Sequence, residues 1–339
     1  MQFGRGKPAN GAFFDSDFTT VDSLLALALL HSLQQKSECR VAIVTISRNN
    51  LKVAGLVDAV ERFYRGPAAV FAQVPPPGML TTGEPGLTSP AFTQPFSKTK
   101  PDGSPVFVNK VARVLDTGDP CTLIRNYLQA QYANGSYFVL YGKATNLAMA
   151  LNFRGVKELA AERSTHLVIA DSPGFFSDLP SARKVLAEWP TPISFVPEEI
   201  GKAIPFPGSA VAKEFLANTP NHPVAEAYTA WQPMPYDAPT TAMAAALHAT
   251  RMKEPYFKVS EPGTLSIGAD GKLAFAPSAQ GKHTQLSLDP AQKEKVQQLY
   301  VELATAKVIP PQRFRPPVAD ADKKADDPAD AVKVLPKQP

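Results

Sequence analysis

Residues 11–33 read GAFFDSDFTTVDSLLALALLHSL, and this stretch decides the fold. It opens with a short apolar run that ends in two aspartates, Asp15 and Asp17, which predicts a first β-strand with acidic groups at its carboxyl end. The segment Val21–Leu33 follows with an almost continuous apolar surface and therefore predicts a buried helix. A strand followed directly by a buried helix is typical of an α/β fold.

The rest of the chain repeats this alternation. Arg40–Ile46 is a β-branched run that fits a buried parallel strand, Leu51–Tyr64 has helical spacing, and Ala68–Val74 is a further short strand. We therefore expect an α/β fold, with an open, mostly parallel sheet flanked by helices in a single domain. Later strands are predicted over Tyr137–Tyr141, His166–Ala170 and Ile193–Val196, a hairpin over Leu265–Ile267 and Lys272–Phe275, and helices over Pro120–Tyr132, Asn146–Leu151, Ser181–Glu188, Ala210–Ala217, Val224–Ala230, Thr240–Ala249 and Pro290–Ala306.

Proline marks the parts of the chain outside this alternation. The chain has 339 residues, of which 34 are proline, about twice the usual share. Eight of them fall within residues 75–105, which predicts a long surface loop or a loop that binds a partner. From residue 310 the sequence turns to Pro, Ala, Asp and Lys without periodicity. We therefore expect one α/β domain over residues 1–310 and a disordered tail over residues 311–339.

Composition excludes several functional classes. The net charge of +4 is mild and scattered, so no nucleic-acid partner is expected. Two cysteines, Cys39 and Cys121, exclude a disulfide framework and a Cys-rich zinc site. No apolar run reaches the roughly 18 residues of a membrane span, and the first residues lack a signal-type segment. The chain as given is expected to be cytoplasmic, although an exported mature form would look the same. Phe18–Thr20 replace the glycines of a dinucleotide-binding loop, which argues against that class.

Three aspartates gather where the first strand meets the first helix. Asp15 and Asp17 end the strand, and Asp22 begins the helix. Crowded carboxylates repel one another unless a cation or protons relieve them, and such oxygen ligands suit Ca²⁺ or Mg²⁺. The alternative is helix capping, in which Asp17 accepts backbone N–H groups and Asp22 lies favourably against the helix dipole. Spacing alone leaves both interpretations open.

Five segments, taken in order, resemble the nucleoside hydrolase family of the inosine–uridine-preferring type. The first is FFDSDFTTVDSLLALALL, which is similar to the family's strand, D-x-D-P-G-x-D-D and helix. The others are IVTISRNN at 43–50, which resembles a strand ending in T-x-x-G-N, YGKATNLA at 141–148, which resembles T-G-P-L-T-N-x-A, WPTPI at 189–193 and SEPGTLSI at 260–267. The resemblance implies the family's α/β fold over nearly the whole predicted domain.

The resemblance also implies a chemistry. The family hydrolyses the N-glycosidic bond of ribonucleosides with a Ca²⁺ that binds water and the ribose hydroxyls. Asp17 matches the aspartate that serves as metal ligand and catalytic base. Asp22 matches a second metal ligand, and Tyr141 matches the residue whose backbone carbonyl binds the metal. A nucleoside or another ribose-containing molecule is the expected partner, and a homo-oligomer is compatible with the sequence.

Three further residues are assigned to the substrate side of the site. Asn50 matches the ribose-facing asparagine, and Asn49 matches it if the alignment shifts by one residue. Asp15 matches the first aspartate of the family pattern, which is usually structural.

Two departures weaken the implied metal site. The neighbour of Asp22 is Val21 or Ser23, so one carboxylate of the family's pair is missing, and Ala242 stands near the place of a later metal aspartate. The substrate segment after the strand His166–Ala170 is also shorter. Because ligand charge tunes calcium affinity, two hypotheses follow: a Ca²⁺-dependent N-glycosidase with impaired activity, or a non-catalytic protein that keeps the fold and binds a ligand or a partner.

Overall fold

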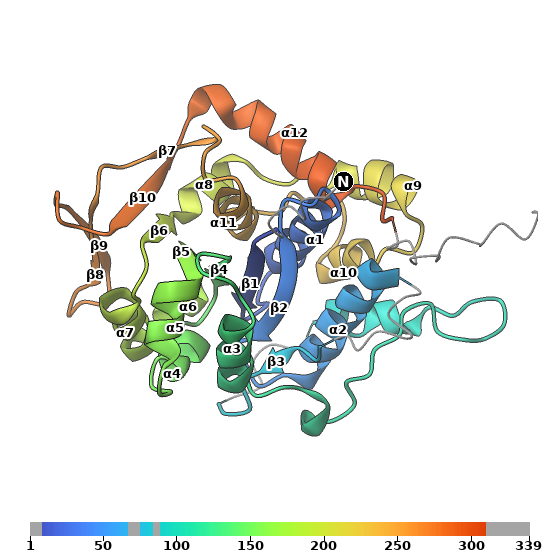
Figure 1. Cartoon of the computed structure of the whole chain (residues 1–339). Coiled ribbons are helices and arrows are strands. Elements are labelled where there is room, and N and C mark those ends of the chain that lie inside the picture. Colours follow the sequence, from blue (N-terminus) through green and yellow to red (C-terminus); the bar gives the residue numbers. More distant parts are fainter. Residues whose placement is uncertain (1–8, 67–74, 84–88, 310–339) are drawn as a thin grey trace, which may run out of the picture.

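The computed structural model of the chain describes residues 9–66, 75–83 and 89–309. The strand predicted over Ala68–Val74 and the tail predicted over residues 311–339 lie outside the described residues. Within them, the chain folds around one ten-stranded sheet with the order β3-β2-β1-β4-β5-β6-β10-β8-β9, and β7 pairs with β10 (Figure 1). The expected single α/β domain with an open, mostly parallel sheet is therefore present.

The sheet is parallel over its larger part. The pairs from β3 through β6, and the pair of β6 with β10, are parallel, whereas β7, β8 and β9 run antiparallel to their neighbours. The strands are β1 Gly11–Ser16, β2 Arg40–Ile46, β3 Gly78–Met79, β4 Ser136–Tyr141, β5 Ser164–Ala170, β6 Ile193–Val196, β7 Phe257–Val259, β8 Gly263–Ile267, β9 Leu273–Pro277 and β10 His283–Leu288.

Helices cover both faces of this sheet. One apolar core lies under α1, α2, α8, α10, α11 and α12, and the other lies under α3, α4, α5 and α7 (Figure 1). The helices are α1 Asp22–Gln35, α2 Leu51–Arg65, α3 Pro120–Gln129, α4 Thr145–Ala150, α5 Val156–Arg163, α6 Pro173–Ser177, α7 Leu179–Glu188, α8 Glu198–Ala203, α9 Leu216–Asn218, α10 Pro223–Trp231, α11 Thr241–Thr250 and α12 Lys293–Ala304. In these parts of the chain no helix is both long enough and apolar enough to cross a bilayer.

Helices α1 and α11 form the centre of the first core. Every residue of α1 from Asp22 to Leu33 is buried, and so is α11 from Thr241 to Ala249. The two helices pack against each other, and α11 also packs on β4 and β5. The alanines of α11 leave little side-chain volume, so its backbone can lie close to its neighbours. This packing brings the N-terminus of α11 to Asp22.

The proline-rich segment holds short elements where the sequence predicts only a loop. Its first described part contains β3, which extends the sheet because Gly78 pairs with Thr45 of β2. Its later part contains two 3₁₀ turns, and Phe92 packs edge-on against Trp231 of α10 with ring centroids 5.7 Å apart. Proline lacks a backbone N–H and interrupts apolar periodicity, which explains why these elements leave no recognisable pattern in the sequence.

Candidate functional site

The carboxyl ends of β2, β1 and β4 place three chain segments side by side. Ser16 pairs with Ile46 on one side and with Tyr141 on the other. The next residue, Asp17, donates its backbone N–H to the Tyr141 carbonyl oxygen at 3.3 Å. Ligands of open α/β sheets bind beyond this edge. The register therefore places Asp17 at the centre of the candidate site.

The Asp17 carboxylate is buried, and only one of its two oxygens accepts hydrogen bonds. Its Oδ1 accepts hydrogen bonds from the backbone N–H of Thr19 at 3.1 Å and from the Thr19 hydroxyl at 2.8 Å. Its Oδ2 has no hydrogen-bond partner among the described residues. Burial raises the pKa of Asp17, while the bonds from Thr19 and the charges of Arg48 and Lys143 partly offset that shift. One buried oxygen of Asp17 therefore keeps an unused capacity to accept a hydrogen bond.

Two glycines let the backbone approach this carboxylate. Gly142 has φ +135°, and a Cβ there would lie 2.7 Å from the Asp17 carboxylate carbon. A Cβ on Gly174, in α6, would overlap Asp17 Oδ2. Any larger residue at either position would have to displace the aspartate.

Asp15 lies behind Asp17 and connects three elements. Its Oδ2 accepts hydrogen bonds from the Thr45 hydroxyl in β2 and from the Asn146 amide in α4, at 2.5 and 2.9 Å. Burial is the largest cause that raises the pKa of Asp15 to about 7, although the hydrogen bonds oppose it. These contacts give Asp15 a positioning role at the strand end.

Asp22 caps a distant helix. Its two carboxylate oxygens accept the backbone N–H groups of Ala242 at 2.6 Å and Met243 at 3.2 Å, in the first turn of α11. The carboxylate is fully buried, which raises its pKa to about 7 against the opposing effect of these bonds. Both oxygens therefore already accept backbone donors, 220 residues further along the chain.

The remaining predicted residues lie on the same edge and already form hydrogen bonds. The Tyr141 carbonyl accepts the N–H of Asp17, and the Tyr141 hydroxyl hydrogen-bonds the Thr20 hydroxyl at 3.1 Å. Asn50 is the N-cap of α2, where its Oδ1 accepts two backbone N–H groups at 3.1 and 3.2 Å. Asn49 is partly exposed and donates to the Gly83 carbonyl at 3.4 Å.

These residues do not fit a calcium ion. Throughout the described ranges, no three His, Cys, Asp or Glu side chains come together as a metal-binding group. Both Asp22 oxygens already accept N–H groups of α11, and Ala242 contributes only its backbone N–H. The predicted ligand set is thereby reduced to Asp17 and the Tyr141 carbonyl, whereas Ca²⁺ takes roughly six to eight oxygen ligands. The charges of Arg48 and Lys143 act on Asp17 from the flanking strand ends and would repel a cation.

Sequence reasoning missed two residues of this edge. Arg48 follows β2 and is only 8 % exposed, yet its Nε and Nη1 have no partner in the described part of the chain. Asn146 donates to Asp15, and its Oδ1 is buried without a partner among the same residues. Both belong to segments that resemble family motifs, so their position after a strand was the available signal. Their burial was not visible in the sequence.

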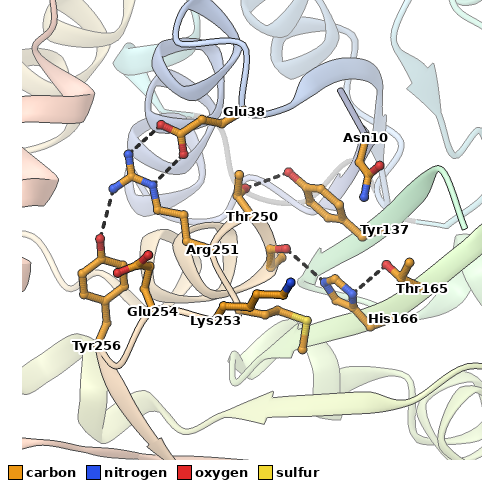
Figure 2. Close-up of a pocket in the computed structure, with 12 residues that line it drawn as sticks. Asn10, Glu38, Tyr137, Thr165, His166, Thr250, Arg251, Lys253, Glu254 and Tyr256 are labelled. Carbon is orange, nitrogen blue, oxygen red and sulfur yellow. Dashed lines mark hydrogen bonds and ion pairs between the residues drawn. The ribbon is translucent and has the colours of Figure 1, made fainter. Parts of the chain in front are cut away.

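A cavity of about 690 Å³ lies at the opposite, amino edge of the sheet (Figure 2). Arg251 and Glu38 line this cavity and form an ion pair with two hydrogen bonds, with N–O distances of 2.7 and 2.8 Å. His166 hydrogen-bonds the Thr165 hydroxyl and the Ala249 carbonyl, at 2.8 and 3.1 Å. Burial lowers the pKa of His166 to about 4. The buried polar groups of this cavity mostly satisfy one another.

Comparisons with known proteins give a result for structure alone. No family model and no curated protein matches the sequence. The fold is similar to a plant nucleoside hydrolase, with TM-score 0.62 and 14 % identity over 88 % of this chain and 100 % of that one. It is equally similar to an inosine–uridine-preferring nucleoside hydrolase from Bacillus anthracis, with TM-score 0.62 and 14 % identity over 87 % and 99 % of the two chains. The type III effector protein XopQ, solved with adenosine diphosphate ribose, matches with TM-score 0.58 and 13 % identity over 90 % and 94 %. The chain therefore has the nucleoside hydrolase fold.

Proposed function

We propose that this chain binds a ribose-containing small molecule at the edge around Asp17, and that it does so without a calcium ion. The observation that carries the proposal is the unpartnered Asp17 Oδ2, together with the unpartnered atoms of Arg48 and Asn146. Buried polar groups in proteins are nearly always hydrogen-bonded, so an unpaired cluster favours a missing ligand. Neighbours in fold are nucleoside hydrolases, and XopQ was solved with adenosine diphosphate ribose.

The geometry suggests a role for each predicted residue. Asp17 Oδ2 accepts a ribose hydroxyl, while Thr19 holds the other oxygen in place. Asp15 fixes the strand end and the Asn146 amide, whose Oδ1 can accept a second hydroxyl. Asn50 and Asn49 border the site at the start of α2. Hydrogen bonds from hydroxyls to a carboxylate are stronger than neutral ones, so Asp17 supplies most of the affinity for the sugar.

N-glycoside hydrolysis is the second candidate function. It is favoured by the raised pKa of Asp17, since a base whose pKa lies closer to neutrality transfers a proton more effectively. Against it stands the incomplete ligand set for calcium, because both oxygens of Asp22 already accept backbone N–H groups. Asp17 would have to orient and deprotonate water without metal assistance.

Calorimetric titration of the full chain in EDTA tests the proposal. We expect adenosine diphosphate ribose or inosine to bind, with the same affinity after addition of Ca²⁺. Asp17→Asn should weaken binding roughly 10- to 100-fold, as expected for a hydrogen bond to a charged group. Asp102→Asn, at an exposed position in the proline-rich segment, is the matched control and should bind these ligands with wild-type affinity.

Two results would overturn the binding proposal. One is the absence of binding by every ribose-containing ligand, and the other is binding that EDTA abolishes. Chromatography of the same mixtures reports released base. Calcium-independent release that stops in Asp17→Asn would favour the second candidate.

A further inference from the structure

Two cations follow the strands on either side of Asp17. Asp17 follows the last residue of β1 and lies between the ends of β2 and β4, because Ser16 pairs with Ile46 and Tyr141. Arg48 follows two residues after Ile46, and Lys143 follows two residues after Tyr141. Neither cation forms an ion pair with a described residue, although both act electrostatically on Asp17. The edge therefore combines two cations with the Asp17 carboxylate, without a close ion pair between them among the described residues.

Arg48 is the stronger anion-binding group of the two. The residue is only 8 % exposed, and its Nε and Nη1 are buried without an acceptor among the described residues. The residue before it is anchored, because the Ser47 N–H donates to the Ser16 carbonyl at 3.0 Å. A buried, unpaired guanidinium is costly, so its retention favours a ligand that pairs with it.

Helix α2 adds a second source of positive potential. It begins at Leu51, three residues after Arg48, and runs for 15 residues. The N-terminus of a helix carries a partial positive charge that favours anions. Arg48 therefore lies close in sequence to this helix end, where the Asn50 side chain accepts the N–H groups of Lys52 and Val53.

We propose that the ligand of this edge is a phosphorylated riboside, with its phosphate bound by Arg48 and its sugar hydroxyls bound by Asp17. This inference rests on the proposed function and names its ligand class. Arginine suits phosphate oxygens because its N–H groups form charge-assisted hydrogen bonds with them. Arg48 then supplies the positive charge that a metal ion would otherwise bring to the edge.

The competing explanation is that Arg48 is purely structural and stabilises the Asp17 charge within the empty protein. The two explanations differ in their effect on stability. If Arg48 is a ligand-binding group, Arg48→Gln removes an unpaired buried charge and the free protein should not lose stability. If Arg48 is structural, the same substitution leaves Asp17 without compensation and lowers the melting temperature.

The experiment titrates the full chain with inosine, inosine 5′-monophosphate, ribose 5-phosphate, adenosine diphosphate ribose and inorganic phosphate. We expect the phosphorylated ribosides to bind at least tenfold more tightly than inosine. Arg48→Gln should remove that advantage, and Arg48→Lys should keep part of it. Inosine affinity should change less than threefold in both variants. Arg125→Gln, at an exposed position on α3, is the matched control.

The outcomes separate this inference from the proposed function. Equal affinity for inosine and its monophosphate, or an Arg48→Gln variant that unfolds earlier and weakens both ligands alike, overturns the phosphate assignment and leaves sugar binding in place. Failure of every ligand to bind overturns both. Binding of inorganic phosphate alone, lost in Arg48→Gln, also overturns the riboside assignment because it makes Arg48 a simple anion site.

Discussion

Asp22 offers the sharpest test of the assigned roles, because a structural cap and a metal ligand respond differently to substitution. In the structure its two oxygens accept the N–H groups of Ala242 and Met243. Asp22→Ala leaves both donors buried without an acceptor, at about 1–3 kcal/mol for each. Asp22→Asn keeps one amide oxygen as an acceptor. We therefore expect the alanine variant to be less stable than the asparagine variant by about 1–3 kcal/mol.

The charge of Asp22 adds a dependence on pH. Burial raises its pKa in the folded chain to about 7, against an ordinary value of 3.8. The folded state therefore binds more protons than the unfolded state between these values, so stability falls as pH rises from about 4 to about 7. Over that window the effect amounts to about 4 kcal/mol. Asp22→Asn lacks this charge, so its stability relative to the wild type should increase as pH rises.

Urea unfolding of wild type, Asp22→Asn and Asp22→Ala at pH 5 and 7 measures both effects. Asp22→Ala should have a lower free energy of unfolding than Asp22→Asn at either pH. The free energy of unfolding of Asp22→Asn relative to wild type should be higher at pH 7 than at pH 5. Equal stability of the two variants would refute the capping role. A difference between wild type and Asp22→Asn that does not change with pH would refute the buried charge.

Three further predictions concern other parts of the fold. Gly174→Ala places a methyl group against the Asp17 carboxylate, so calorimetry should show ribose-ligand affinity falling at least tenfold; unchanged affinity would contradict the close approach. His166 is held neutral, since burial lowers its pKa to about 4. Because the unfolded chain binds this proton more readily, the free energy of unfolding falls as pH falls from 6.5 to 4. His166→Gln should reduce that fall by up to about 3 kcal/mol in urea unfolding. A pH profile identical to that of wild type would argue against this. Glu38→Gln breaks the pair with Arg251, which should cost about 1 kcal/mol at low salt and less at high salt; a cost independent of salt would contradict an electrostatic origin.

The central strands were predictable because their signal is local. The runs at β1, β2 and β4 are apolar and bounded by polar residues, and the structure places strands there. Strands β10 and β7 were not predicted from the sequence. The β10 sequence HTQLSL alternates buried and exposed positions only partly, and it becomes a strand by pairing with β6, β7 and β8. Such tertiary pairing leaves a weak pattern in the sequence.

The location of the candidate site was also predictable, whereas the partners of its residues were not. Asp15, Asp17 and Tyr141 gather at the carboxyl edge because strand order brings their segments together. The acceptor role of Asp22 depends on a helix that begins more than 200 residues later. The importance of Arg48 depends on burial, which spacing along the chain does not reveal.

The central claim is that this edge keeps the fold's ligand position without its calcium site. Calorimetric titration of Ca²⁺ into the EDTA-stripped full chain, with Asp17→Asn and Asp22→Asn in parallel, tests it most directly. We expect no saturable binding up to millimolar Ca²⁺ in any of the three proteins, because both oxygens of Asp22 already accept backbone N–H groups and Arg48 and Lys143 oppose a cation. Micromolar binding by the wild type that disappears in Asp17→Asn or Asp22→Asn would contradict the account.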